Sequence, residues 1–134
     1  MKPYRIFISH SWKYASHYDR LYALLDQQRS YFDFADYSAP QEYALDGSNR
    51  NVWEGINERI RLSQAIIIPA GVYVTHSESI TKEIEIAQSY RKPIIAVKPR
   101  ENEYLSQIAV NASWVAPVGW NGASIAKSII SLIG

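Results

Sequence analysis

Glu83 is the residue whose type and place in the sequence most clearly suggest chemistry. It lies in the stretch 75–87, where a period of about 100° per residue predicts a helix with one apolar stripe facing the core. The residues on that stripe are Ile80, Ile84 and Ala87. Glu83 falls on the flank of the stripe, so its carboxylate should be partly desolvated and suited to electrostatic or hydrogen-bonding work on a substrate. A structural alternative is that this first-turn acid stabilises the helix dipole or pairs with Lys82 or Arg91.

The segment after the first expected strand excludes several familiar chemistries. Residues 9–13 contain no glycine, so they form neither a Walker loop nor a dinucleotide-binding fingerprint. A phospho-receiver needs acidic residues there and an aspartate after the third strand, where residues 69–71 are Pro-Ala-Gly. The three histidines lack metal-ligand spacing and no Gly-x-Ser-x-Gly elbow is present, so we expect no metal site and no serine-hydrolase elbow.

Strand and helix patterns alternate along the chain and must position these residues. The expected strands are 4–8, 31–34, 65–69, 93–97 and a weak fifth at 114–116, and the expected helices are 18–25, 52–60, 77–90 and a last one from about 121. The run 65–69 is wholly apolar, which is typical of a strand buried on both faces, whereas 31–34 is more polar and suits an edge. This alternation predicts an α/β fold in three layers, a flavodoxin-like five-stranded parallel sheet of order 2-1-3-4-5.

Ligands in such folds bind at the carboxyl ends of the strands. The segments expected at that end are 9–13, 36–40, 69–73, 98–100 and 118–121. The stretch from 35 to 50 is rich in Ala, Ser, Pro, Gly, Asn and Asp, which predicts a long loop leading away from the same end. Structureless loops of that length inside a compact domain are more often functional than accidental.

Composition excludes several classes of protein. The 134 residues are 47% hydrophobic, with a net charge of +1, which fits a single domain spanning 1–134 and gives no reason to expect a nucleic-acid partner. No apolar run is long enough for a membrane span or a signal-peptide core, so we expect no membrane partner. Cysteine is absent, which fits a cytoplasmic location and rules out thiol chemistry.

Four blocks, taken in order, resemble a known family. The block 4–11 (YRIFISHS) is similar to the opening strand and loop of TIR (Toll/interleukin-receptor) domains, and 36–51 stands where that family has its BB loop. The block 77–87 (Ser-x-Ser-Ile-x-x-Glu-Ile-x-x-Ala) is similar to the family's Ser-x-Trp-x-x-x-Glu helix, and 91–99 resembles the basic, proline and strand sequence that follows. The resemblance covers nearly the whole chain and is strongest to small bacterial TIR-like proteins related to the Thoeris antiphage sensor subunit, ThsB.

The resemblance implies that Glu83 is the catalytic residue and that the reaction cleaves the N-glycosidic bond between nicotinamide and ribose in NAD. NAD is then a substrate, and no cofactor is expected. Nicotinamide is already a good leaving group, so a carboxylate need only stabilise positive charge at the ribose and orient its hydroxyls. The substrate contacts expected with it are Ser9, His10, Ser11, Trp12, Asp36, Tyr37, Tyr73 and Ser77.

Aromatic residues account for 13% of the chain, and some fall where a nucleotide would stack. Trp12, Tyr37, Tyr73 and Trp120 lie on segments assigned to the carboxyl ends of the strands, which predicts an aromatic rim around Glu83. The family's aromatic four residues before the catalytic glutamate is replaced here by Ser79. This departure, with a loop that lacks the Arg-Asp and Pro-Gly pairs of receptor TIR domains, leaves two alternatives open.

One alternative is a non-catalytic TIR-like interaction module that assembles through exposed aromatics such as Tyr14, Tyr43 and Tyr104. The other is an N-glycosidic enzyme similar to nucleoside 2-deoxyribosyltransferases, acting on free nucleosides. In the favoured hypothesis the product, an ADP-ribose-derived nucleotide, activates a separate effector protein in bacterial antiphage defence, because the chain is too small to carry an effector domain of its own. Assembly into a homo-oligomer through TIR surfaces is a further expectation from the resemblance.

Overall fold

The computed structural model describes residues 2–9, 15–38, 50–71, 78–99 and 105–134. Its four strands are β1 (Tyr4–Ile8), β2 (Phe34–Asp36), β3 (Ala65–Pro69) and β4 (Ile94–Val97). They form a parallel sheet of order β2-β1-β3-β4, in which Ile6 pairs with Asp36 and Ile8 with Ile67. The predicted flavodoxin-like α/β class is therefore confirmed, with four strands where five were expected.

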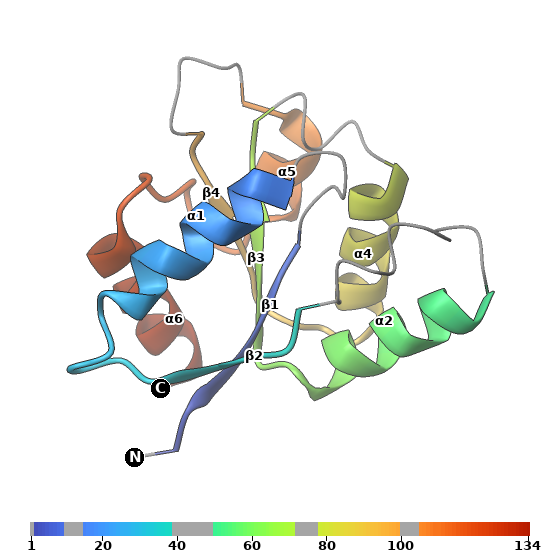
Figure 1. Ribbon diagram of the computed structural model, residues 1–134. Helices are drawn as coiled ribbons and strands as arrows, with labels where there is room; N and C mark the ends of the chain where they lie inside the picture. Colours follow the sequence, from blue (N-terminus) through green and yellow to red (C-terminus); the bar gives the residue numbers. More distant parts are fainter. Residues whose placement is uncertain (1, 10–14, 39–49, 72–77, 100–104) are drawn as a thin grey trace.

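Helices cover both faces of this sheet, as Figure 1 shows. They are α1 (Ala15–Asp26), α2 (Arg50–Leu62), α4 (Glu78–Ser89), α5 (Gln107–Ala112) and α6 (Gly122–Ile133). Helices α1 and α6 pack on one face, and α2, α4 and α5 pack on the other. Within the described ranges, none of these helices has the length and apolar character needed to cross a membrane.

The two faces are built by alternating side chains of the same strands. Ile6 and Ile8 point to the α1/α6 face, whereas Phe7 between them points to the α2/α4 face. The same alternation in β3 sends Ile67 to the first face and Ile66 to the second. All five residues of β3 are buried, which confirms the expectation of a strand covered on both sides.

The fifth strand predicted at 114–116 is wrong, because only part of its ladder forms. Val118 makes an isolated parallel bridge to β4, but no strand precedes it. The Ser113 Oγ accepts a hydrogen bond from the Ala96 backbone N–H at 3.0 Å, replacing a strand carbonyl. The Trp114 N–H donates to the Ile94 carbonyl at 2.7 Å and the Val118 N–H to the Ala96 carbonyl at 2.9 Å, so this segment advances four residues against two of β4 and does not pair continuously.

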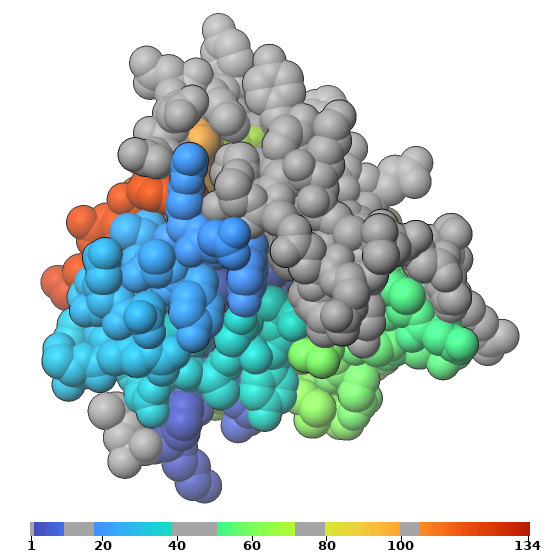
Figure 2. Space-filling view, viewed as in Figure 1, coloured from blue at the N-terminus to red at the C-terminus, as the bar shows by residue number. Residues whose placement is uncertain are grey.

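The second strand also differs from its prediction at 31–34. The backbone N–H groups of Tyr31 and Phe32 both donate to the carbonyl of Gln28, so these two residues belong to the turn that ends α1. The strand begins only at Phe34 and runs to Asp36. It does lie at the edge of the sheet, and Figure 2 shows it between α1 and α2 on the molecular surface.

Candidate functional site

Glu83 lies in α4 at the carboxyl end of the sheet and is more deeply buried than its sequence position predicts. Only 1% of Glu83 is exposed, and it lies in sequence between the buried Ile80 and Ile84 of the same helix. Its carboxyl oxygen Oε2 accepts a hydrogen bond from the Oγ of Ser9, the residue directly after β1. The predicted catalytic glutamate and one of its predicted neighbours, 74 residues apart in sequence, are thus in direct contact.

Ser9 is held in place from two neighbouring segments. Its backbone N–H donates to the carbonyl of Ile67 in β3 at 2.8 Å, which extends the parallel ladder beyond β1. The N–H of the preceding residue, Ile8, donates to the Oγ of Ser38 at 2.8 Å. The Ser9 hydroxyl therefore projects from backbone that is fixed by the sheet.

Asp36, at the end of β2, anchors the segment on the other side of β1. Its Oδ1 accepts a hydrogen bond from the Ser38 N–H at 2.9 Å, and its Oδ2 accepts one from the Tyr18 hydroxyl of α1. The Arg59 Nη1 of α2 donates to the Ser38 carbonyl at 3.3 Å. Tyr18 and Ser38 were not among the predicted site residues, because one reads as part of a helix's apolar face and the other as an ordinary loop serine.

Burial dominates the electrostatics of Glu83. Desolvation raises the pKa of the Glu83 carboxyl from 4.5 to about 8, and the hydrogen bond from Ser9 acts in the opposite direction. Burial, followed by the hydrogen bond to Asp36, also raises the pKa of the Tyr18 phenol, so this hydroxyl remains a donor throughout the physiological range. At neutral pH the buried carboxyl is mostly protonated in this state of the protein.

The ion pairs that could have given Glu83 a structural role are not formed in the described part of the chain. The Lys82 Nζ lies over the ring of Trp53 in α2, 4.3 Å from its centroid, and thus ties α4 to α2 instead. Arg91 is exposed in the turn after α4, where it adopts a φ of 53°. Among the described residues, the carboxyl group of Glu83 contacts the hydroxyl of Ser9, which is a neutral partner.

Four of the predicted site residues fall within the described ranges: Ser9, Asp36, Tyr37 and Glu83. Tyr37 is half-buried and its N–H donates to the carbonyl of Ile6 at 2.7 Å, so it follows β2 beside β1. Trp120 packs against the core of the α1/α6 face. The other predicted site, rim and contact residues lie outside the described ranges: His10, Ser11, Trp12, Tyr14, Tyr43, Tyr73, Ser77 and Tyr104. Within the described ranges, no group of three or more His, Cys, Asp or Glu side chains could hold a metal ion.

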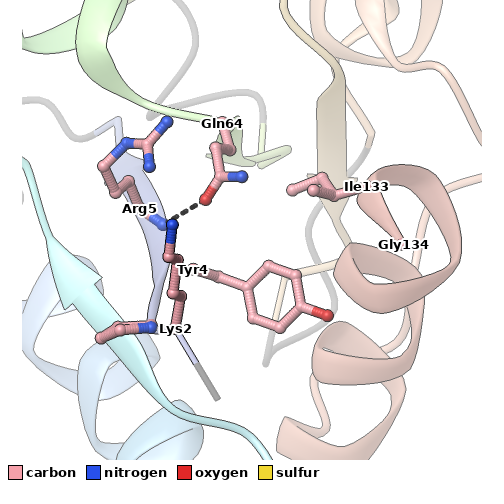
Figure 3. A pocket seen from close by; sticks show the side chains of 7 residues that line it. Lys2, Tyr4, Arg5, Gln64, Ile133 and Gly134 are labelled. Atoms are coloured by element: carbon pink, nitrogen blue, oxygen red, sulfur yellow. Dashed lines mark hydrogen bonds between the residues drawn. The ribbon is translucent and has the colours of Figure 1, made fainter.

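A cavity of about 310 Å³ lies at the opposite, amino end of the sheet (Figure 3). It is lined by Lys2, Pro3, Tyr4, Arg5, Gln64, Ile133 and Gly134. The two cationic side chains of the cavity have structural explanations. The Arg5 Nε donates to the carbonyl of Leu62 at the end of α2, at 2.7 Å. Lys2 shares the cavity with the C-terminal end of α6, where the helix dipole favours positive charge. The cavity is separated from Glu83 by the length of β1 and is not part of the candidate site.

Comparisons with known proteins identify a family and a similar fold. A family model described as the TIR-like domain of the Thoeris protein ThsB matches residues 7–104. Among solved structures, a CMP N-glycosidase of Clostridium botulinum, BcmB, is similar in fold, with a TM-score of 0.56 and 17% sequence identity over 94% of this chain and 98% of that chain. A search of curated proteins finds no match.

Proposed function

The chain belongs to the family of Thoeris ThsB TIR-like domains, and we propose that it is an enzyme that cleaves the N-glycosidic bond of a nucleotide, with NAD as its substrate and Glu83 as its catalytic residue. The observation that carries the proposal is the buried contact between Glu83 and Ser9 at the carboxyl end of a parallel sheet, the end at which ligands bind in such folds. The similarity of fold to an N-glycosidase supports the same class of reaction.

The chemistry asks little beyond a well-placed carboxylate. As the bond from ribose C1 to nicotinamide breaks, the ring gains positive charge, and an ionised Glu83 stabilises that charge in a water-poor site. The bond's electron pair leaves with nicotinamide, which becomes neutral and needs no proton. Water or an internal nucleophile then forms the new bond to C1 and releases one proton to solvent, giving ADP-ribose or a cyclic isomer. Neither a metal nor a further cofactor takes part in this proposal.

The Glu83 pKa sets the expected pH dependence. Since the carboxyl must be ionised to stabilise the developing cation, kcat/KM for NAD should rise with pH and level off above about 8. If Glu83 acted instead as a general acid, the rate would fall over the same range. The slope of the profile therefore distinguishes the two roles.

We also propose a role in the cell, which the family membership supports. The nucleotide product serves as a diffusible signal that activates a separate effector protein in antiphage defence, and the domain acts in the cytoplasm, in an assembly of identical copies. Asp36 and Tyr37 remain proposed substrate contacts within the described ranges, as do His10, Ser11, Trp12, Tyr73 and Ser77 outside them, whereas the Ser9 hydroxyl is bonded to Glu83.

The test is product analysis by mass spectrometry after incubation of the purified protein with NAD, with CMP and with free nucleosides. We expect nicotinamide release from NAD by the wild type and a loss of at least about a thousandfold for Glu83→Gln, which keeps the shape but not the charge. The matched control is Glu85→Gln, an exposed acid on the same helix, which should retain full activity. Equal turnover by wild type and Glu83→Gln would remove Glu83 from the mechanism.

The assay also separates the alternative functions. Cleavage of CMP or of nucleosides but not NAD would keep the bond type and change the substrate. The alternative is a non-catalytic interaction module, in which Glu83 stays covered as it is here, with 1% of the residue exposed. That function predicts no turnover with any of the three substrates, even with infected-cell lysate added, and an unchanged antiphage phenotype in Glu83→Gln.

A further inference from the structure

We propose that Ser9 is a positioning residue for Glu83: its hydroxyl fixes the orientation of the carboxyl group and stabilises the ionised form that the reaction uses. The structure places the Ser9 Oγ on Glu83 rather than towards an open surface, since both residues are almost completely buried. This role differs from the direct substrate contact that the sequence predicts for Ser9. Its catalytic meaning rests on the proposed function, but the contact itself can be tested without it.

The backbone around Ser9 is rigid enough for such a role. Ser9 lies one residue beyond β1, and its N–H is bonded to Ile67 in the buried strand β3. On the other side the Ile8 N–H is bonded to the Ser38 Oγ, and Ser38 is in turn bonded to Asp36 and Arg59. Interactions from the sheet and from α2 thus hold the backbone at Ser9, and its side chain has one rotatable bond before the hydroxyl.

The charged groups described around Glu83 have other partners or are exposed, and the carboxyl group of Glu83 is bonded to Ser9. On α4 itself, Lys82 is directed to Trp53 and Glu85 is exposed. On α2, Glu54 is exposed and Arg59 bonds to the Ser38 carbonyl. On the α1/β2 side, the Tyr18 hydroxyl is bonded to Asp36. Within the described residues, burial and the Ser9 hydroxyl are the two causes that set the Glu83 pKa.

Loss of the hydroxyl should therefore change both ionisation and orientation. A hydrogen bond to a buried charged group is strong enough to shift a pKa by about one to two pH units when it is removed. Ser9→Ala should raise the Glu83 pKa by this amount, because the bond from Ser9 lowers it. At a fixed neutral pH, the ionised fraction and with it kcat should fall about tenfold to a hundredfold, whereas KM should change little.

The experiment combines an infrared titration with kinetics. The protonated carboxyl band of Glu83 is isolated as the difference between each protein and its Glu83→Gln counterpart, and is followed from about pH 5 to about pH 10. Variants are Ser9→Ala, Ser9→Thr, which keeps the hydroxyl, and Ser63→Ala. Ser63 is the matched control, since it is also fully buried but bonds to the Arg59 carbonyl at the end of α2, away from Glu83. Circular dichroism checks that each variant is folded.

The expected result is a higher Glu83 titration midpoint in Ser9→Ala, a midpoint near that of the wild type in Ser9→Thr and Ser63→Ala, and a kinetic pH profile that moves with the midpoint. An unmoved midpoint in Ser9→Ala would overturn the proposal. So would a raised KM with an unmoved pH profile, because that pattern belongs to a direct substrate contact. If the wild type cleaves no nucleotide, the proposed function fails, while the infrared titration still decides whether Ser9 sets the state of Glu83.

Discussion

Replacing Glu83 by glutamine should stabilise the protein, and by an amount that grows with pH. In the unfolded chain this carboxyl ionises near its ordinary pKa of 4.5, whereas burial raises its pKa in the folded protein to about 8. Between these two values the folded state retains a proton that the unfolded state has released. The free energy of unfolding of the wild type therefore falls as the pH rises from about 4.5 to about 8, and the neutral glutamine removes this dependence.

The size of the effect follows from the two pKa values. Each pKa unit corresponds to about 1.4 kcal/mol, so the full loss of wild-type stability above pH ~8 is roughly 5 kcal/mol. Roughly 1 kcal/mol of this is already lost at pH ~5 and roughly 3 kcal/mol at pH ~7. For a domain of this length, 1 kcal/mol moves the Tm by roughly 3–5 °C. The Tm of Glu83→Gln should therefore exceed that of the wild type by a margin that widens by more than about 10 °C between pH ~5 and pH ~8.5.

The measurement is thermal and urea unfolding of both proteins at half-unit pH steps across that range. Every other titrating group is shared, so the difference between the two proteins isolates residue 83. Glu85→Gln is the control, because an exposed acid on the same helix should change the free energy of unfolding by no more than about 0.5 kcal/mol at any pH. A difference between wild type and Glu83→Gln that stays constant from pH ~5 to pH ~8.5 would refute the argument from burial.

Two further substitutions test the packing that positions the site. Gly122→Ala should lower the free energy of unfolding by at least about 1–3 kcal/mol, measured by urea unfolding. A Cβ at the start of α6 meets the backbone carbonyl of Leu24 in α1, which cannot move aside. An unchanged urea midpoint would show that the two helices are more loosely packed. Ser38→Ala should cost about 1–3 kcal/mol and speed hydrogen exchange of the Ile8 amide, because the hydroxyl to which this amide donates is removed. Unchanged exchange would contradict that contact.

The buried strands were predictable from their continuous apolar runs, and their order from the alternation of strand and helix patterns. The runs at β3 and β4 are continuously apolar, and only a strand covered on both faces suits such a run at that length. The start of β2 was not predictable, because Phe32 fills the core as a strand residue would, while its backbone N–H donates to the carbonyl of Gln28. Hydrophobic spacing does not distinguish a turn that buries one aromatic ring from a strand that buries it.

Helix α5 was missed for a related reason. Its buried residues are the small Ala109 and Ala112, whereas the large Ile108 is 49% exposed. Apolar periodicity is dominated by large side chains, so in six residues the pattern contained no helical signal. The expected fifth strand does not form, because the Ala96 N–H of β4 donates to the side-chain hydroxyl of Ser113 and not to a backbone carbonyl of a neighbouring strand.

For the site, helical phase correctly placed Glu83 beside the buried stripe of α4, and strand ends correctly placed Ser9 at the same end of the sheet. Their contact depends on how closely α4 lies against β1 and on the side-chain directions, which no local pattern contains. The depth of burial was underestimated for the same reason. A flank position on an isolated helix is half exposed, and here the rest of the fold covers it, leaving 1% of the residue accessible.

The way Glu83 is partnered argues against a stabilising role for its carboxyl group and supports the proposed catalytic one. Among the described residues, the acids that form ion pairs do so at the surface with arginine, as Asp26 does with Arg29 at 2.6 Å and Glu58 with Arg61. Such surface pairs lose little of their hydration. The carboxyl group of Glu83, in contrast, is removed from water and is bonded to a neutral hydroxyl, that of Ser9. At neutral pH this arrangement subtracts several kcal/mol that a glutamine would restore. Stability given up at one residue, at the ligand-binding end of the sheet, is the pattern expected of a functional carboxyl.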